Sequence, residues 1–317
     1  KIKFKITIFL IFILSILIFT EKILSYPSKM GPLSKKLTVV IPKSSSLLNI
    51  ALILEEKNVI KNRYYFIIHT YFLGKDKSLK AGEYSFNKNT SQEIVINKLY
   101  KNEVKLYKLV IPECYSNKKI LEIIKKNLHV SDGLINYPEG SFFPSTYFYS
   151  KDTKANKLLS IMKDNAKVKF SKIYNKYKHN VGGIINQNEV LVLASIVEAE
   201  AKKKEDQSKI AAVFYNRLKK GMKLQSDPTV IYGINKTVYL DRQLNRSDLL
   251  VEHEWNTYKI HGLPPTPICN VGLDAFYAAL NPEKSSNLYF VADGQGGHLF
   301  SESYEEHKNN IKKIYKN

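Results

Sequence analysis

The clearest periodic pattern in the chain lies in the segment that begins at Leu191. At three- and four-residue spacing, one face carries Leu191, Ala194, Ser195, Glu198 and Ala201. This spacing predicts an α-helix from about Glu189 to Lys203, capped by Asn186 or Asn188. Glu198 is then a carboxylate in an apolar stripe.

Glu198 and Glu200, two of the acids of this predicted helix, have different expected roles. A carboxyl group on an apolar face is partly desolvated, which raises its pKa, so Glu198 is suited to general acid catalysis near neutral pH. The alternative is a salt bridge to Lys202 at i+4. Glu200 lies roughly 200° further round the helix, beside Lys203 and Lys204, and is predicted to be an ion-pairing surface residue.

A second pattern is an internal repeat. VVIPKSSSLLNIALIL, from Val39, aligns with LVIPECYSNKKILEII, from Leu109. Each copy predicts a strand, a proline turn and a helix that begins at a serine. With a helix near Ser91 to Leu99 and a strand near Lys105 to Ile111, the first copy predicts a small αβ unit.

Three shorter patterns lie in the C-terminal third. Gly272 to Leu280 predicts a helix, and the strand predicted from Leu288 to Ala292 is followed by a hairpin turn that contains Gly294, Gly296 and Gly297. The segment from His261 to Asn270 contains three prolines, which stiffen a loop. It predicts either a rigid wall of a cleft or a structural connector.

The N-terminus carries an uncharged run from Ile6 to Thr20 behind Lys1, Lys3 and Lys5. This run rises about 22 Å as a helix, and extension over residues 2–24 with snorkelling ends reaches the hydrocarbon thickness of about 30 Å. A cleaved signal peptide is the alternative, but Leu24 to Pro27 is a poor cleavage site. We expect a retained single span with its N-terminus in the cytoplasm, and the sequence has no lipobox-like cysteine.

Composition adds two constraints. At 317 residues and 44% hydrophobic content, the chain is expected to form two domains plus an anchor. The net charge of +20 raises the possibility of nucleic-acid binding, but the lysines are spread along the whole chain and no nucleic-acid motif is present. A basic surface outside a membrane better suits anionic lipid or the acidic peptides of cell-wall material.

No metal or cofactor is predicted. His253, His261 and His298 are scattered, and the spacing of Cys114 and Cys269 suits no metal site. Whether the two thiols pair is left open by the sequence.

Four long motifs, in order, resemble the endolytic murein transglycosylases of the MltG (YceG-like) family. They are SIVEAEA from Ser195, VFYNRLKKGMKLQSDPTVIYG from Val213, NTYKIHGLPPTPICNVGLDAFYAALNP from Asn256 and LYFVADGQGGHLF from Leu288. Earlier segments, LKAGEYSF, VIPECYS and EGSFFPSTYFY, extend the resemblance to nearly everything from about Leu37 onward.

The resemblance implies lytic cleavage of the MurNAc–GlcNAc bond within glycan strands, leaving a 1,6-anhydro end and consuming no water. Glu198 matches the family's catalytic Glu. Because the nucleophile is the sugar's own C6 hydroxyl, one Glu can protonate the glycosidic oxygen and then, as carboxylate, take the C6 proton. Ordinary glycosidases need a second carboxylate.

Polar and aromatic residues after this helix are predicted to form the sugar cleft, because polar groups that orient a ligand are few and convergent. They are Asn216, Arg217, Gln225, Ser226, Asp227, Thr229, Tyr232, Asn256, Thr257 and Tyr258. The alternatives are ion pairing for Arg217, core packing for the tyrosines and turn formation for Asp227, which precedes a proline.

The chain departs from the family pattern at a few positions. Cys114 stands where the family usually has Gly and Cys269 where it has Ala or Ser, so both are interpreted as tolerated substitutions. If the backbone at residue 114 has a positive φ, Cys carries strain there. Ala199 and Ala201 replace larger or polar residues beside the acid.

The predicted organisation is an α+β protein in four parts: a cytoplasmic stub and transmembrane anchor (1–25), a linker (26–36), a LysM-like αβ subdomain (37–112) and a larger mixed α/β catalytic domain (113–317). The last three parts lie on the outer, periplasmic side of a bacterial inner membrane. Expected partners are peptidoglycan strands, the bilayer through residues 2–24 and, by resemblance, peptidoglycan synthases. An ordinary packing domain is the alternative for residues 37–112. For the whole chain the rivals are a catalytically silent peptidoglycan-binding scaffold and a membrane-associated nucleic-acid binder.

Overall fold

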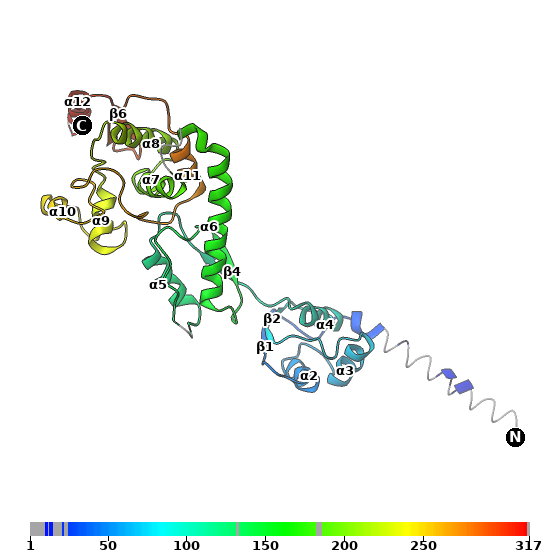
Figure 1. Ribbon diagram of the computed structural model, residues 1–317. Coiled ribbons are helices and arrows are strands. Elements are labelled where there is room, and N and C mark those ends of the chain that lie inside the picture. Colours follow the sequence, from blue (N-terminus) through cyan, green and yellow to red (C-terminus); the bar gives the residue numbers. More distant parts are fainter. Residues whose placement is uncertain are drawn as a thin grey trace, which may run out of the picture. The chain divides into compact units, whose positions relative to one another are not determined.

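A computed structural model describes residues 25–130, 133–181 and 186–315, together with residues 10, 11, 13, 14 and 21 (Figure 1). The chain divides into two compact units. Unit 1 comprises Lys1–Tyr107 and Phe148–Asp152, and unit 2 comprises Lys108–Tyr147 and Thr153–Asn317.

Unit 1 is built around a two-stranded antiparallel sheet in which β1 (Leu37–Ile41) pairs with β2 (Gly82–Phe86). Alternate residues of the two strands are buried, and Tyr84 lies directly opposite Val39 in the register. The core continues into three α-helices, α2 (Leu47–Glu56), α3 (Arg63–Phe72) and α4 (Gln92–Lys101). A short 3-10 helix, η1 (Tyr26–Ser28), has no buried residue and contacts α4.

The strand and the two helices predicted for the αβ unit are present as β1, α2 and α4, with α3 as an additional helix. The strand predicted near Lys105 to Ile111 does not join this sheet: it is β3 (Tyr107–Val110), which pairs with β4 (Thr146–Tyr149) and lies mostly in unit 2.

The internal repeat has a structural counterpart. Ser46 caps α2 by accepting from the Asn49 N–H, and Ser116 caps α5 (Asn117–Asn127) in the same way. Two residues before each cap, Ser44 and Cys114 have left-handed backbones, with φ of 61° and 58°. The condition under which Cys114 carries strain is therefore met, and a non-glycine residue there costs on the order of 1 kcal/mol.

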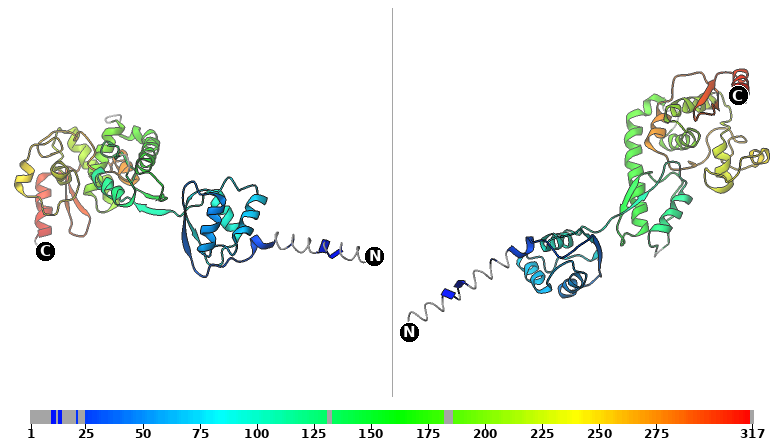
Figure 2. Two further views of the ribbon diagram at one scale, coloured as in Figure 1. Left: turned by 90° about the horizontal axis from the view of Figure 1, so that it is seen from below. Right: turned by 180° about the vertical axis from the view of Figure 1, so that it is seen from behind.

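Unit 2 is mainly helical. Its largest group is α7 (Gln187–Glu200), α8 (Lys204–Lys219) and α11 (Leu273–Leu280), which pack on one another, with the long α6 (Ala155–Tyr177) running beside α11 in Figures 1 and 2. The remaining elements that lie wholly in unit 2 are α5, η2 (Lys178–Val181), α9 (Asp227–Asn235), α10 (Arg246–Leu250), β5 (Tyr289–Ala292), β6 (His298–Ser301) and α12 (Tyr304–Tyr315). The strands β3 (Tyr107–Val110) and β4 (Thr146–Tyr149) form a further two-stranded sheet.

The C-terminal predictions hold. The predicted helix is α11, with Gly272 at its N-cap, and β5 pairs with β6 as an antiparallel hairpin. In the hairpin turn the Asp293 carboxylate accepts from the Gln295 and Gly297 N–H groups, while Gly294 and Gly296 have positive φ.

The fold class is confirmed as mixed α+β with small antiparallel sheets. The predicted anchor from Ile6 to Thr20 falls almost entirely outside the described residues. Among the residues that are described, no helix has both the length and the apolar run needed to cross a bilayer.

Candidate active site

The helix that carries both candidate acids is α7, and it ends earlier than the periodicity predicts. Asn186 caps it with a capping box, in which Asn186 Oδ1 accepts from the Glu189 N–H and the Glu189 carboxylate accepts from the Asn186 N–H. The helix ends at Glu200, because Ala201 has an extended backbone with ψ of 112°. Nearly every residue from Val190 to Val197 is buried, so α7 lies inside the unit rather than presenting one apolar stripe.

This early end corrects the prediction for Glu200. Without a further helical turn, Lys203 and Lys204 are not its neighbours at i+3 and i+4. Lys204 instead begins α8 and forms an ion pair with Asp274. Glu200 is not a surface ion-pairing residue: its carboxylate accepts a hydrogen bond of 2.5 Å from the Ser226 hydroxyl.

Three carboxyl groups in unit 2 have a pKa raised to about 7, and burial is the main cause for each: Glu139, Glu198 and Glu200. Raised pKa values alone therefore do not identify an acid, because buried structural carboxyls show them too. Their partners and surroundings distinguish the three.

The carboxylate of Glu139 is fully engaged in hydrogen bonds that join segments distant in sequence. It accepts from the backbone N–H of Asn117 at 2.8 Å, from the Gly140 N–H at 3.3 Å and from the Tyr232 hydroxyl at 3.1 Å. The Asn270 amide adds a fourth contact at 3.3 Å. A carboxylate with this many internal donors has a structural role.

Glu198 lies on the other side of α7 from Glu200, since two residues turn a helix by about 200°. Its Oε2 accepts from the Gly272 N–H at 3.0 Å, at the start of α11. Burial raises the pKa of Glu198, this hydrogen bond lowers it, and the nearby negative charges of Glu113 and Asp274 raise it. The predicted raised pKa of Glu198 is confirmed, whereas the alternative salt bridge to Lys202 is absent among the described residues.

Glu200 lines a cavity of about 300 Å³. After burial, the Ser226 hydrogen bond lowers its pKa, the Asp227 charge raises it and the Arg217 charge lowers it. The full lining is Glu200, Arg217, Gln225, Asp227, Tyr258, Tyr289, Phe290, Tyr304 and His307. This cavity, called the Glu200 pocket below, combines a carboxyl of neutral pKa with polar groups and several aromatic rings.

The predicted cleft residues that meet at this pocket are Arg217, Gln225, Ser226, Asp227 and Tyr258. Asp227 is the first residue of helix α9 rather than part of a turn, and its carboxylate accepts from the Tyr258 hydroxyl at 2.7 Å. Gln225 enters the pocket from a left-handed backbone with φ of 49°, held by its N–H bond to the Thr257 carbonyl.

Arg217 forms the back of the pocket. Its guanidinium donates to the carbonyls of Leu288 and Leu224, both at 2.7 Å, and lies 5.3 Å from the centre of the Tyr289 ring. The alternative prediction, an ion pair with a helix acid, is wrong because backbone carbonyls take up these donors. Arg217 thus holds β5 against α8 and places a positive charge near Glu200.

The other predicted cleft residues have internal partners and lie outside the pocket lining. Thr229 and Thr257 are fully buried and hydrogen-bonded to each other at 2.9 Å. The Asn256 amide donates to Leu249 and Val251 carbonyls, and the Asn216 amide donates to Ser285 and Asn287 carbonyls. The Tyr232 hydroxyl donates to Glu139. These five residues shape the loops around the site.

Part of the pocket was not anticipated from the sequence. Tyr289 and Phe290 come from β5, and Tyr304 and His307 come from α12. The His307 ring lies nearly parallel to that of Tyr289, 5.3 Å away, and its buried Nδ1 has no hydrogen-bond partner among the described residues. The aromatic motif of β5 was a usable signal, whereas α12 lay beyond the last of the four motifs.

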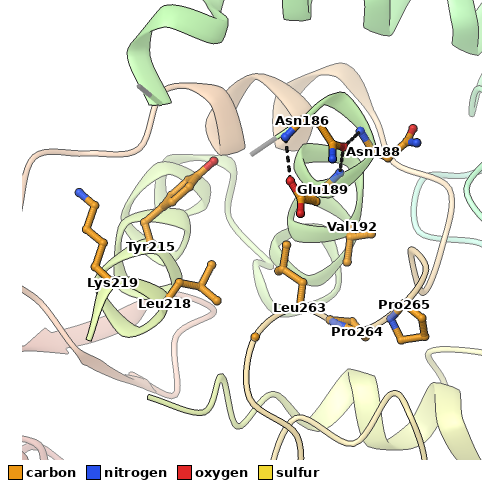
Figure 3. A pocket seen from close by; sticks show the side chains of 11 residues that line it. Asn186, Asn188, Glu189, Val192, Tyr215, Leu218, Lys219, Leu263, Pro264 and Pro265 are labelled. Atoms are coloured by element: carbon orange, nitrogen blue, oxygen red, sulfur yellow. Dashed lines mark hydrogen bonds between the residues drawn. The ribbon is translucent and has the colours of Figure 1, made fainter. Parts of the chain in front are cut away.

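Two larger cavities in unit 2 are less suited to catalysis. Figure 3 shows one of about 570 Å³, between the start of α7 and α8, with Pro264 and Pro265 along its edge. The proline-rich segment predicted as a cleft wall therefore borders this cavity. The carboxylate that lines this cavity, that of Glu189, is already hydrogen-bonded in the capping box of α7. The other, of about 690 Å³, contains Asn216, whose amide is already bonded.

Glu200→Gln should stabilise the protein at pH 8 and much less at pH 5. The folded pKa of about 7 exceeds the ordinary value of 4.5, so stability is lost as pH rises from about 4.5 to 7, and the penalty is fully present above pH 7. A neutral amide removes a penalty on the order of 1–3 kcal/mol. Thermal unfolding at both pH values measures it, with exposed Glu252→Gln as the control, and equal destabilisation at both would contradict the account.

The comparisons with known proteins agree on one family. The YceG-like family model matches residues 39–313. The chain is 32% identical over 308 residues to the endolytic murein transglycosylase of Bacillus subtilis (strain 168), covering 87% of this chain and 83% of that protein.

Two further relatives extend this finding. The chain is 30% identical over 330 residues to the endolytic murein transglycosylase of Streptococcus pneumoniae (strain ATCC BAA-255 / R6), covering 87% of this chain and 58% of that protein. A yceG-like protein of Listeria monocytogenes, with a crystal structure at 2.6 Å, aligns with a TM-score of 0.56 and 33% identity over 87% of this chain and 98% of that one.

Proposed function

Because the chain belongs to the YceG-like family, we propose that it is a peptidoglycan lytic transglycosylase that cuts within glycan strands, with Glu200 as its acid. The relatives named endolytic murein transglycosylases support the reaction class. The observation that carries the residue assignment is the Glu200 pocket, where a carboxyl of neutral pKa faces a cavity lined by polar and aromatic side chains.

The proposed reaction needs one proton carrier. The MurNAc–GlcNAc bond breaks as protonated Glu200 donates its proton to the glycosidic oxygen, giving GlcNAc a free hydroxyl. The C6 hydroxyl of MurNAc then attacks C1, and the Glu200 carboxylate takes the C6 proton. A 1,6-anhydro bond has formed, no water is consumed, and Glu200 is protonated again.

The groups around Glu200 suit this cycle. The Ser226 hydroxyl and the Arg217 charge stabilise the carboxylate form, whereas burial and Asp227 favour the protonated form. This balance places the pKa near 7, where an acid that must later act as a base works best. We propose that the Tyr289 and Tyr304 rings offer faces to the sugar rings.

Glu198, the acid expected from the motif, is less well placed. It lies outside the lining of the three unit 2 cavities described above, and its carboxylate is bound to the start of α11 through Gly272. We propose that Glu198 positions α11 against α7 and that the adjacent Glu200 carries the proton.

A hydrolytic glycosidase is the second candidate function, because Asp227 supplies another carboxylate in the same pocket. In a hydrolase the second carboxylate attacks the sugar or activates water. Here the Asp227 carboxylate accepts from Tyr258, which fits an orienting role.

Product chemistry separates the candidates. Purified sacculi are incubated with the full chain, and the muropeptides are identified by mass spectrometry. We expect new 1,6-anhydro ends inside strands. Reducing MurNAc ends would indicate the hydrolase, and uncut sacculi with retained protein would indicate the silent scaffold.

The activity should fall tenfold per pH unit above about pH 7, because the acid must be protonated. Two substitutions should shift this alkaline limb of the pH–activity profile in opposite directions. Asp227→Asn removes a negative charge and shifts the limb to lower pH, whereas Ser226→Ala removes a hydrogen bond to the carboxylate and shifts it to higher pH. Rates of anhydro-end formation from pH 5 to 9 measure the limb, and an unmoved limb in both variants would contradict Glu200 as the titrating group.

We also propose the location expected from the sequence. A single span within residues 2–24 would hold the enzyme at the bacterial inner membrane with unit 2 on the periplasmic side, beside newly made strands and their synthases. Protease accessibility of unit 2 in spheroplasts tests this orientation, and protection of unit 2 would contradict it.

A further inference from the structure

Unit 1 presents an exposed aromatic face that its own core does not use. On α3, the side chains of Tyr64, Tyr71 and Phe72 are 66%, 60% and 75% exposed, and Ile68 is 42% exposed. At 100° per residue these four positions fall within about 100° of the helix circumference. They therefore form one stripe, called the α3 face below.

The opposite side of α3 is fixed in the unit. Phe66 and Thr70 are fully buried, and His69 is buried with its ring nitrogen 2.6 Å from the Gln92 amide. Asn62 caps the helix through the Tyr64 and Tyr65 N–H groups. The α3 face is thus held rigidly outward, and large apolar side chains gathered on a surface mark an interaction site.

The chain enters unit 1 at the edge of this face. The ring of Tyr26, in η1, packs 4.6 Å from that of Tyr65, which follows Tyr64 on α3. In sequence, η1 comes directly after the apolar segment that ends near Thr20. A bilayer that holds that segment would lie close to the α3 face.

The charges around α3 suit an anionic surface. Lys57 and Lys61 precede the helix and are exposed, Lys75 follows it, and no Asp or Glu occurs from residue 57 to residue 75. The acids that flank this stretch are Glu55, which is ion-paired with Arg63 of α3, Glu56 and Asp76. Lysines beside anionic lipid each contribute about 1 kcal/mol of attraction, and tyrosine and phenylalanine rings favour the headgroup region.

From these observations we propose that the α3 face lies in the headgroup region of an anionic lipid bilayer. Unit 1 would then bind the membrane through its own surface, in addition to any anchoring by the N-terminal apolar segment. The partner is identified by chemistry: the aromatic rings and apolar side chains enter the interface, and Lys57 and Lys61 contact lipid phosphates.

The test is lipid quenching of a tryptophan placed on the face. Full-length Phe72→Trp is reconstituted into phosphatidylglycerol vesicles that contain nitroxide-labelled lipid, and the wild type, which has Trp255 alone, supplies the background. Leu106→Trp, at a 58% exposed position of unit 1 outside α3, is the matched control. Tyr71→Trp repeats the test at a second position of the face.

We expect both face tryptophans to be quenched at least about threefold more strongly than the control, with weaker quenching in phosphatidylcholine or at high salt. Equal quenching at all three positions would overturn the proposal. A blue-shifted emission without lipid quenching would also overturn it, since a second copy, unit 2 or another protein would then cover the face. Failure of the full chain to associate with vesicles would do the same.

Discussion

Glu200→Gln is expected to lower the rate of glycan strand cleavage by about 10³-fold while leaving the fold intact, because removing a positioned acid and base typically costs 10²–10⁴-fold. Gln is isosteric, and its side-chain carbonyl can still accept the Ser226 hydrogen bond. The Glu200 pocket should therefore keep its shape and lose only the transferable proton. Turnover of sacculi, with strand binding measured in parallel, checks this result.

Glu200→Asp is the matched variant. It keeps the carboxyl group but withdraws it by one methylene, so the account predicts a partial loss and a retained pH limb. If Glu200→Gln cleaved strands at the wild-type rate, the proton would have to come from another group in unit 2.

Asn270→Ala is expected to destabilise the protein by about 3 kcal/mol, at the upper end of what most single substitutions cost, because it breaks a buried hydrogen-bond network. Asn270 is fully buried. Its amide group donates to the Tyr115 carbonyl at 2.8 Å and to Asn117 Oδ1 at 2.9 Å, and its Oδ1 accepts from the Phe142 N–H at 2.7 Å. Truncation leaves the Phe142 N–H and Asn117 Oδ1 buried without these partners, whereas the Tyr115 carbonyl keeps its hydrogen bond from the Asn270 N–H at 3.0 Å.

Thermal unfolding of unit 2 measures this effect, with a fall in Tm on the order of 10 °C. Asn270→Asp keeps the shape but loses the amide donors and adds a charge 3.3 Å from a Glu139 oxygen, so it should be comparably destabilised at pH 8 and less at pH 5. Exposed Asn309→Ala is the control. An unchanged Tm in Asn270→Ala would show that the loops of this region do not depend on the network.

The features that were predicted correctly from the sequence are those formed by residues close to one another along the chain. The caps at Ser46, Ser116 and Asn186 and the glycine turn of the C-terminal hairpin are formed by residues a few positions apart. Fold class and most of the αβ unit followed from these elements.

The proposal of Glu200 rather than Glu198 as the acid rests on where α7 ends. No glycine or proline directly follows Glu200, and Lys202 to Lys204 are good helix formers. The periodic pattern therefore predicted a helix that ends three residues later than α7 does. That extension placed Glu200 at the surface. The aromatic wall from β5 and α12 is formed by packing of distant segments, which spacing along the chain does not reveal.

Comparing Glu198→Gln with Glu200→Gln in one assay decides which of the two carboxyl groups carries the proton. Both are isosteric changes in the same helix, at carboxyls whose pKa values are each about 7. The measurement is the rate at which each variant forms internal 1,6-anhydro ends on the same sacculi. The account predicts near wild-type product from Glu198→Gln and almost none from Glu200→Gln, whereas the reverse order would place the acid at Glu198 and contradict the assignment to the Glu200 pocket.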